Sequence, residues 1–229
     1  MLTPKKKISK KELKEDALVS TYVKATTFYE EHKRIISIGV TAFAVIVIAL
    51  IVYGKNRADN NTNASTALGN VYQLFDNGQY QLAVDGVPER GIKGLKAIVD
   101  DYGNSKAGEI ARFYLGTAYY HLARYDEAIE QFKQASLSDE TLEISRLSGI
   151  ACAYEAKGMP KEAAEYFEKA AAKNSKDVNA AENLNNAARN YAQAGDKGTA
   201  LELYRKLKKT YPSSPAARDA DREIAALSL

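Results

Sequence analysis

The chain has 229 residues, of which 45% are hydrophobic, and its 32 lysines and arginines slightly outnumber its 29 aspartates and glutamates. Only 14 residues are glycine and 5 are proline, whereas 36 are alanine, the strongest helix former. This composition excludes collagen-like, low-complexity and disordered classes and favours an all-α protein, while the single cysteine, Cys152, excludes a disulfide-stapled domain.

The charge is divided unevenly along the chain. Residues 1–34 carry nine basic and five acidic side chains, and we interpret them as a basic cytoplasmic tail. Residues 55–229 carry 23 basic and 24 acidic side chains. Because a near-neutral domain lacks the basic surface that contacts phosphates, nucleic acid is not an expected partner.

Residues 35–53 form an uncharged apolar run of 19 residues, which as a helix spans about 28 Å, close to the thickness of a bilayer core. The run predicts a single uncleaved transmembrane helix over residues 35–54. A cleaved signal peptide would have a shorter apolar region followed by a small-x-small site. A buried core helix would keep a polar stripe, and here only Ser37 and Thr41 are polar.

The basic residues around this run predict its orientation. Nine lysines and arginines precede it, whereas only Lys55 and Arg57 follow closely, so the N-terminus should be cytoplasmic. In a bacterium the protein would then lie in the inner membrane with its C-terminal part in the periplasm. Residues 55–66 are polar and predict a linker or an extension of the helix.

An internal repeat is the most specific feature of the remaining sequence. Three segments of about 35 residues match one another at six positions each. The matched positions are Leu115, Gly116, Tyr119, Ala128, Phe132 and Ala135, then Ile150, Ala151, Tyr154, Ala163, Phe167 and Ala170, then Ala187, Ala188, Tyr191, Ala200, Tyr204 and Leu207.

This spacing resembles that of the tetratricopeptide repeat, in which two antiparallel helices cross at small residues. Gly158 and Gly195 fall at the turn between the two helices, where a left-handed backbone is needed, and Ala123 stands there in the first copy. The resemblance implies a right-handed helical solenoid, which we place at residues 67–229. A helix near residues 216–227 should cap it.

A fourth, degraded copy precedes these three. Leu74, Gly78, Tyr80 and Ala83 occur in the right order, but the breaker-rich stretch 85–91 interrupts the second helix. Helical periodicity resumes after this stretch. We therefore expect about four repeats, of which the first is irregular.

The inventory of chemically reactive side chains is small. His121 and Cys152 fall at different repeat positions, and no spacing typical of a metal site, a catalytic pair or a phosphate-binding loop occurs. We expect no catalytic residue, metal, cofactor or small-molecule substrate, and therefore no enzyme.

The concave groove that stacked first helices form is the predicted binding site, because such grooves bind extended peptides or partner helices. The alternative is that the aromatic side chains, Phe113 and Tyr120 among them, only pack against the next repeat. By the repeat register the groove residues are Leu68, Tyr72, Phe113, Thr117, Tyr120, Glu155, Asn185 and Arg189, with Ser148 and Cys152 between them.

A basic tail, one anchor preceded by FYEEHKR and about four such repeats together resemble the ancillary tetratricopeptide subunit of the bacterial Sec translocon. The resemblance implies a chaperone-like adaptor that holds exported chains beside the translocon, with translocon subunits and a membrane-anchored prolyl isomerase as partners. The alternative is a structural scaffold of the cell envelope, because the YPSSPA turn also resembles repeats of outer-membrane assembly and cell-division coordinator proteins.

Overall fold

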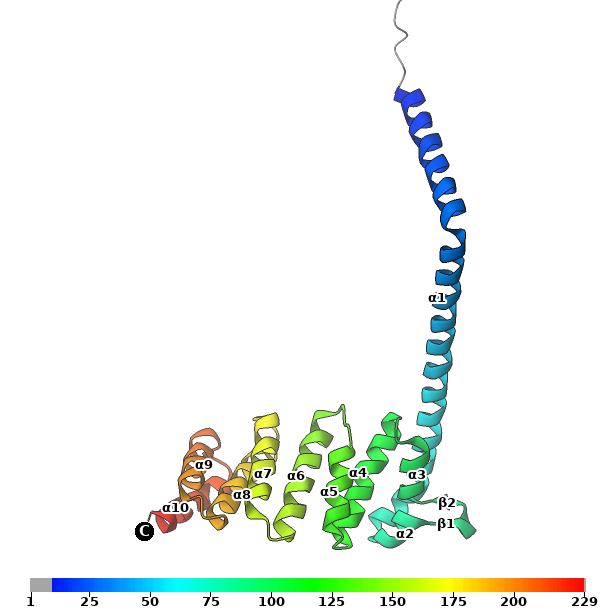
Figure 1. Ribbon diagram of the computed structural model, residues 1–229. Coiled ribbons are helices and arrows are strands. Elements are labelled where there is room, and N and C mark those ends of the chain that lie inside the picture. Colours follow the sequence, from blue (N-terminus) through cyan, green and yellow to red (C-terminus); the bar gives the residue numbers. More distant parts are fainter. Residues whose placement is uncertain (1–9, 229) are drawn as a thin grey trace, which may run out of the picture. The chain divides into compact units, whose positions relative to one another are not determined.

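Ten α-helices and one small β-hairpin make up residues 10–228, the part of the chain that the computed structural model describes (Figure 1). The described residues before Arg57 form one unit, and those from Arg57 onward form a second. Residues 1–9 of the predicted tail and Leu229 of the predicted repeat domain lie outside the described residues. The all-α prediction is confirmed, since the two strands have only two residues each.

The first helix, α1 (Lys10–Asp76), runs without a break through the apolar run and through the polar residues 55–66. In that polar segment the hydroxyl groups of Thr62, Ser65 and Thr66 donate to backbone carbonyls four residues earlier, at distances of 2.8–3.2 Å. These bonds satisfy the hydroxyl groups without a partner outside the helix.

Three antiparallel helix pairs and a final helix form the regular part of the second unit, as the repeats predict (Figure 1). Each second helix also packs on the first helix of the next pair, and α10 packs on α9 and α8. The pairs are α4 (Lys106–His121) with α5 (Tyr125–Gln134), α6 (Glu140–Ala156) with α7 (Pro160–Lys173), and α8 (Ala180–Gln193) with α9 (Lys197–Thr210), followed by α10 (Pro215–Leu227).

The turns between paired helices have the predicted left-handed backbone. The φ angle is +73° at Gly158 and +86° at Gly195, and it is +57° at Ala123, where a side chain makes the conformation costly. Gly78 ends α1 in the same way, with a φ of +71°. The repeat register derived from the sequence is therefore confirmed at every turn.

In the irregular first repeat, buried side chains at the end of α1 share one cluster with those of α2 (Tyr80–Asp85) and α3 (Leu95–Tyr102). Between α2 and α3 the chain forms an antiparallel hairpin of β1 (Gly86–Val87) and β2 (Ile92–Lys93), joined by the short helix η1 (Pro88–Arg90). A Cβ on Gly86 would lie 2.4 Å from the Gly94 nitrogen, so this crossing of the chain requires glycine.

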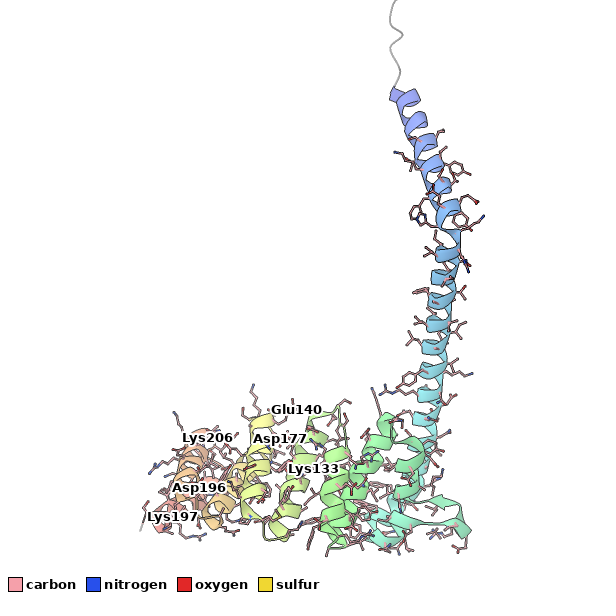
Figure 2. The ribbon with its side chains drawn as sticks, viewed as in Figure 1. Lys133, Glu140, Asp177, Asp196, Lys197 and Lys206 are labelled. Atoms are coloured by element: carbon pink, nitrogen blue, oxygen red, sulfur yellow. The ribbon has the colours of Figure 1, made fainter. Side chains whose placement is uncertain are left out.

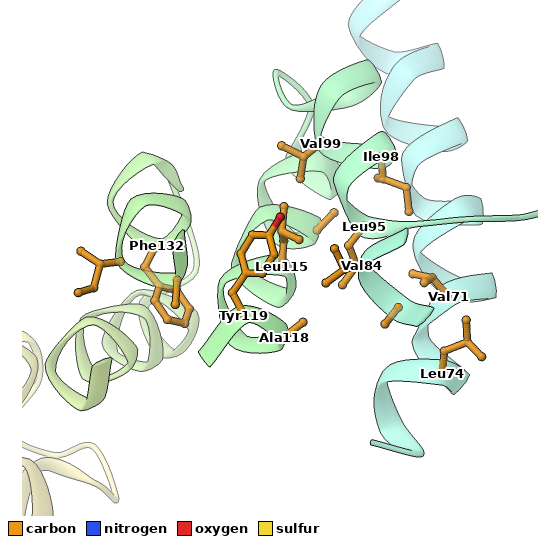
Figure 3. Close-up of a cluster of buried hydrophobic side chains, with 14 of the residues drawn as sticks. Val71, Leu74, Val84, Leu95, Ile98, Val99, Leu115, Ala118, Tyr119 and Phe132 are labelled. Carbon is orange, nitrogen blue, oxygen red and sulfur yellow. The ribbon is translucent and has the colours of Figure 1, made fainter. Parts of the chain in front are cut away.

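The hydrophobic core of the second unit consists of two clusters that follow the repeats. One contains buried side chains from the end of α1 through α6, and the other runs from α6 through α10. Figure 3 shows Val71 and Leu74 of α1 on the same cluster as Val84, Leu95 and Leu115. The end of α1 is thus an integral first helix of the repeat array, and its burial stabilises the array by the hydrophobic effect.

Candidate functional site

The predicted groove residues all lie on first helices of the repeats. Each is at least partly exposed, as a binding residue must be, and Tyr72 and Arg189 are the most exposed of them. The structure places Leu68 and Tyr72 on α1, Phe113, Thr117 and Tyr120 on α4, Glu155 on α6, and Asn185 and Arg189 on α8.

Aromatic rings connect the first two repeats on this face. Tyr72 is 44% exposed, and its ring meets that of Tyr114 edge-on at 5.7 Å between centroids. Tyr114 in turn lies 5.0 Å from Phe75, which lies 5.4 Å from Tyr80. Such edge-on pairs are favourable beyond the area that they bury, so these rings hold one another in place.

Two of the predicted aromatic residues have clear packing roles. The ring of Phe113 lies 5.8 Å from that of Phe132, which is buried in the core. The ring of Tyr120 lies 5.8 Å from that of Tyr125, and burial raises the pKa of the Tyr120 phenol, which stays neutral. Both rings therefore link α4 to α5 while keeping part of their surface exposed.

The predicted polar residues at the other end of the array interact with one another. Glu155 accepts a hydrogen bond from Nη2 of Arg189 at 2.8 Å and another from Nδ2 of Asn190 at 3.1 Å. This ion pair links α6 to α8 and leaves no uncompensated charge at Arg189. Within residues 10–228 the Asn185 side chain makes no hydrogen bond, so its amide remains available.

Two buried asparagines on α8 were missed by the sequence reasoning. Asn183 is 4% exposed and accepts a hydrogen bond from the Ser148 hydroxyl at 3.0 Å, and Asn190 is fully buried. Nδ2 of Asn183 and Oδ1 of Asn190 have no partner in the described part of the chain. Asn183 could have been found, because it shares the apolar stripe of Ala180, Leu184 and Ala187.

Cys152 on α6 is half-buried. Burial is the main cause that raises the pKa of its thiol, and the charge of Glu155 adds to the effect. The thiol is therefore protonated and weakly nucleophilic at neutral pH. No group of three histidine, cysteine, aspartate or glutamate side chains in the described residues is arranged to hold a metal ion.

The apolar run on α1 is unburied in its own unit. Most large side chains from Ile35 to Tyr53 are 57–70% exposed, and none of the most apolar 18-residue window is buried. Among the residues described, α1 is the one helix long and apolar enough to cross a membrane. By length and composition it fits a membrane span, and a signal segment near an N-terminus has the same properties.

Paired helices that bury small residues, with left-handed turns 35 and 37 residues apart at Ala123, Gly158 and Gly195, define the class as a helical-repeat protein that binds other proteins. The tetratricopeptide repeat model matches residues 88–139 and 149–215, which is more than half of the chain. The chain therefore belongs to the tetratricopeptide repeat family.

Solved structures of similar fold agree with this assignment. A Podosopora anserina protein of nearly identical TPR-like repeats, described as a kinesin light chain, aligns with a TM-score of 0.53 and 20% identity over 73% of this chain and 86% of that one. A variant of the same protein with one substitution aligns with a TM-score of 0.53 and 19% identity over 73% and 85% of the two chains. At this identity the likeness shows the fold alone. No curated protein matches the chain.

Proposed function

We propose that this protein is a membrane-anchored module that holds exported polypeptides near the Sec translocon. One observation carries the proposal: the helix that bears the exposed apolar run also supplies the buried first helix of the repeat array. One continuous helix would therefore both cross the bilayer and form part of the core of the protein-binding domain. Tethering of this kind raises the local concentration of the domain near its partners and compensates for weak binding.

The proposed organisation follows the sequence. Residues 1–34 form a cytoplasmic tail and residues 35–54 span the inner membrane. Residues 55–66 continue the helix α1 from the span into the repeat array, and residues 67–229 form a periplasmic repeat domain. The excess of basic residues before the span supports this orientation. The partners would be translocon subunits, exported chains and a membrane-anchored prolyl isomerase, as the resemblance to the ancillary translocon subunit implies.

The binding surface in this proposal is the face of the first helices. Its aromatic end, with Tyr72, Phe113 and Tyr120, offers contact area at a low cost in side-chain entropy. Its polar end offers the free Asn185 amide, which can pair with an extended backbone. Such a surface suits unfolded chains of many sequences, with binding in roughly the micromolar range.

Crosslinking in membranes tests this function. Replacing Tyr120 and Asn185 together by alanine should reduce crosslinks to nascent exported chains while the unfolding midpoint shows that the domain stays folded. The matched control replaces the exposed Lys161 and Lys173 of the second helix α7 by alanine, and it should crosslink as the wild type does. Unchanged crosslinking in a folded Tyr120→Ala, Asn185→Ala variant excludes this face, and crosslinks to assembled envelope proteins alone favour a structural scaffold.

A further inference from the structure

A cleft of about 240 Å³ lies at the start of α4, and the function proposed above does not use it. Arg57 of α1 and Lys106 of α4 line it together with the loop residues Asn104, Ser136 and Ser138, and Glu109 is its one acidic residue. All of these residues belong to the second unit. The cleft therefore combines two basic side chains and one carboxylate with an amide and three serine hydroxyl groups, that of Ser105 included.

The charges of the cleft do not cancel one another. Glu109 lies 3.7 Å from Nε of Arg112 and accepts the Ser136 amide at 2.9 Å, so this carboxylate already has partners. Arg57 and Lys106 are exposed, and neither makes an ion pair or side-chain hydrogen bond within residues 10–228. Two cations are thus left uncompensated at the mouth of the cleft.

Two backbone amides at the start of α4 already have partners. The Ala107 amide donates to Oδ1 of Asn61 at 2.9 Å, and the Gly108 amide donates to the Ser105 hydroxyl at 3.0 Å. The side chains of the cleft offer a guanidinium fork, an ammonium group, an amide and hydroxyl groups as donors. This combination is chemically suited to the oxygens of a phosphate group.

The position of Arg57 in the chain identifies the source of that phosphate. Arg57 follows Tyr53, the last residue of the apolar run, by four residues, and four residues reach at most about 14 Å. If residues 35–53 span the bilayer, as the proposed function requires, Arg57 lies within reach of the lipid headgroups. We propose that the cleft formed by Arg57 and Lys106 binds the phosphodiester headgroup of an anionic phospholipid.

Native mass spectrometry of the full-length protein in detergent tests this inference. The protein is titrated with phosphatidylglycerol and with phosphatidylcholine of the same acyl chains. We expect phosphatidylglycerol to bind more tightly, and the Arg57→Gln, Lys106→Gln variant to lose roughly tenfold or more of that affinity, because each basic group near a membrane surface contributes roughly a fivefold factor.

The matched control is Arg205→Gln with Lys206→Gln, which removes the same charge from exposed positions on α9, where Figure 2 labels Lys206. Its affinity for phosphatidylglycerol should stay within about twofold of the wild type, since only the remote potential changes. A loss in the control as large as that in the cleft variant would overturn the proposal, because the effect would then follow net charge alone.

Two further results would overturn it. Equal affinity for the two lipids would show that the headgroup charge is not recognised. Displacement of phosphatidylglycerol by millimolar inorganic phosphate, with phosphate itself bound, would assign the cleft to a soluble anion. Carbonate extraction of membranes distinguishes a failure of the proposed function from a failure of the lipid-binding proposal. A protein that carbonate extracts has no membrane span, which refutes the proposed function. A protein that stays in the membrane but shows no lipid preference refutes only lipid binding by the cleft.

Discussion

Phe132 packs directly against two glycines of neighbouring first helices. A Cβ on Gly149 would lie 2.8 Å from Cζ of the Phe132 ring, and one on Gly116 would lie 2.9 Å from Cδ1. The ring is 2% exposed and belongs to the hydrophobic core. These two glycines therefore set how closely α4 and α6 approach the second helix between them.

Gly149→Ala should lower the free energy of unfolding by about 1–3 kcal/mol, because the added methyl group overpacks the Phe132 site. Gly198→Ala is the control: its Cβ would meet only Oδ1 of Asp196 at 3.7 Å, so this variant should be neutral or up to about 1 kcal/mol more stable. Urea denaturation followed by helical circular dichroism measures both. Equal stabilities of the two variants would contradict the packing assigned to Phe132.

Tyr191 makes stability depend on pH in the alkaline range. Burial, followed by the nearby Glu168 carboxylate, raises the pKa of its phenol to about 12 from an ordinary value near 10. The folded state then holds the proton more tightly than the unfolded state does. This contribution is complete below pH 10 and is lost as the pH rises through 12.

Tyr191→Phe should consequently show a smaller fall in unfolding midpoint between about pH 9 and about pH 12 than the wild type, since the variant has no phenol to ionise at this position. It should also be less stable at about pH 8, because the hydrogen bond to Oε2 of Glu168 at 3.2 Å is lost. Midpoints at several pH values test this. A difference that stays constant with pH would refute the assigned shift.

At the scale of single elements, the turn between α4 and α5 departs from the others. Ala123 takes the left-handed conformation that Gly158 and Gly195 take in the next two repeats. A Cβ on Gly158 would have nothing within 4 Å, so the cost of a side chain there is conformational and not steric crowding by neighbours. The first regular repeat thus carries a local strain that the second does not.

Ala123→Gly should raise the free energy of unfolding by about 0.5–1 kcal/mol, because glycine adopts this backbone without the Cβ penalty. Gly158→Ala is the reverse experiment in the neighbouring repeat, and it should lower stability by about 1 kcal/mol. Denaturation midpoints of the two variants should therefore move in opposite directions. A destabilised Ala123→Gly variant would show that the alanine side chain has a packing role at this turn.

At the scale of the whole molecule, the main prediction concerns topology. Protease added to spheroplasts should digest the chain beyond about residue 60 and spare the N-terminal tail, because basic residues that precede an apolar run favour a cytoplasmic N-terminus. Immunoblots with antibodies against each end detect the protected fragment. Digestion of the tail alone would reverse the orientation, and release of the whole repeat domain without protease would indicate a cleaved signal segment.

Much of this architecture follows from the sequence. Local or periodic patterns reveal the apolar run, the small residues of the repeats and the turn positions. Such patterns can be interpreted directly from backbone geometry and the hydrophobic effect. The irregular first repeat was also evident, because the glycines and proline of residues 85–91 cannot continue a helix. The structure adds that they form an ordered hairpin.

The candidate face was predicted less completely, because its chemistry depends on which side chains meet between repeats. The repeat register placed Glu155 and Arg189 correctly on first helices, but only tertiary packing decides that they form an ion pair and that Asn190 joins them. Likewise, Arg57 and Lys106 are 49 residues apart in the chain and share a cleft only because α1 contacts the start of α4 near Asn61. Sequence periodicity shows which residues share a face of a single helix, whereas these contacts form between side chains on separate helices.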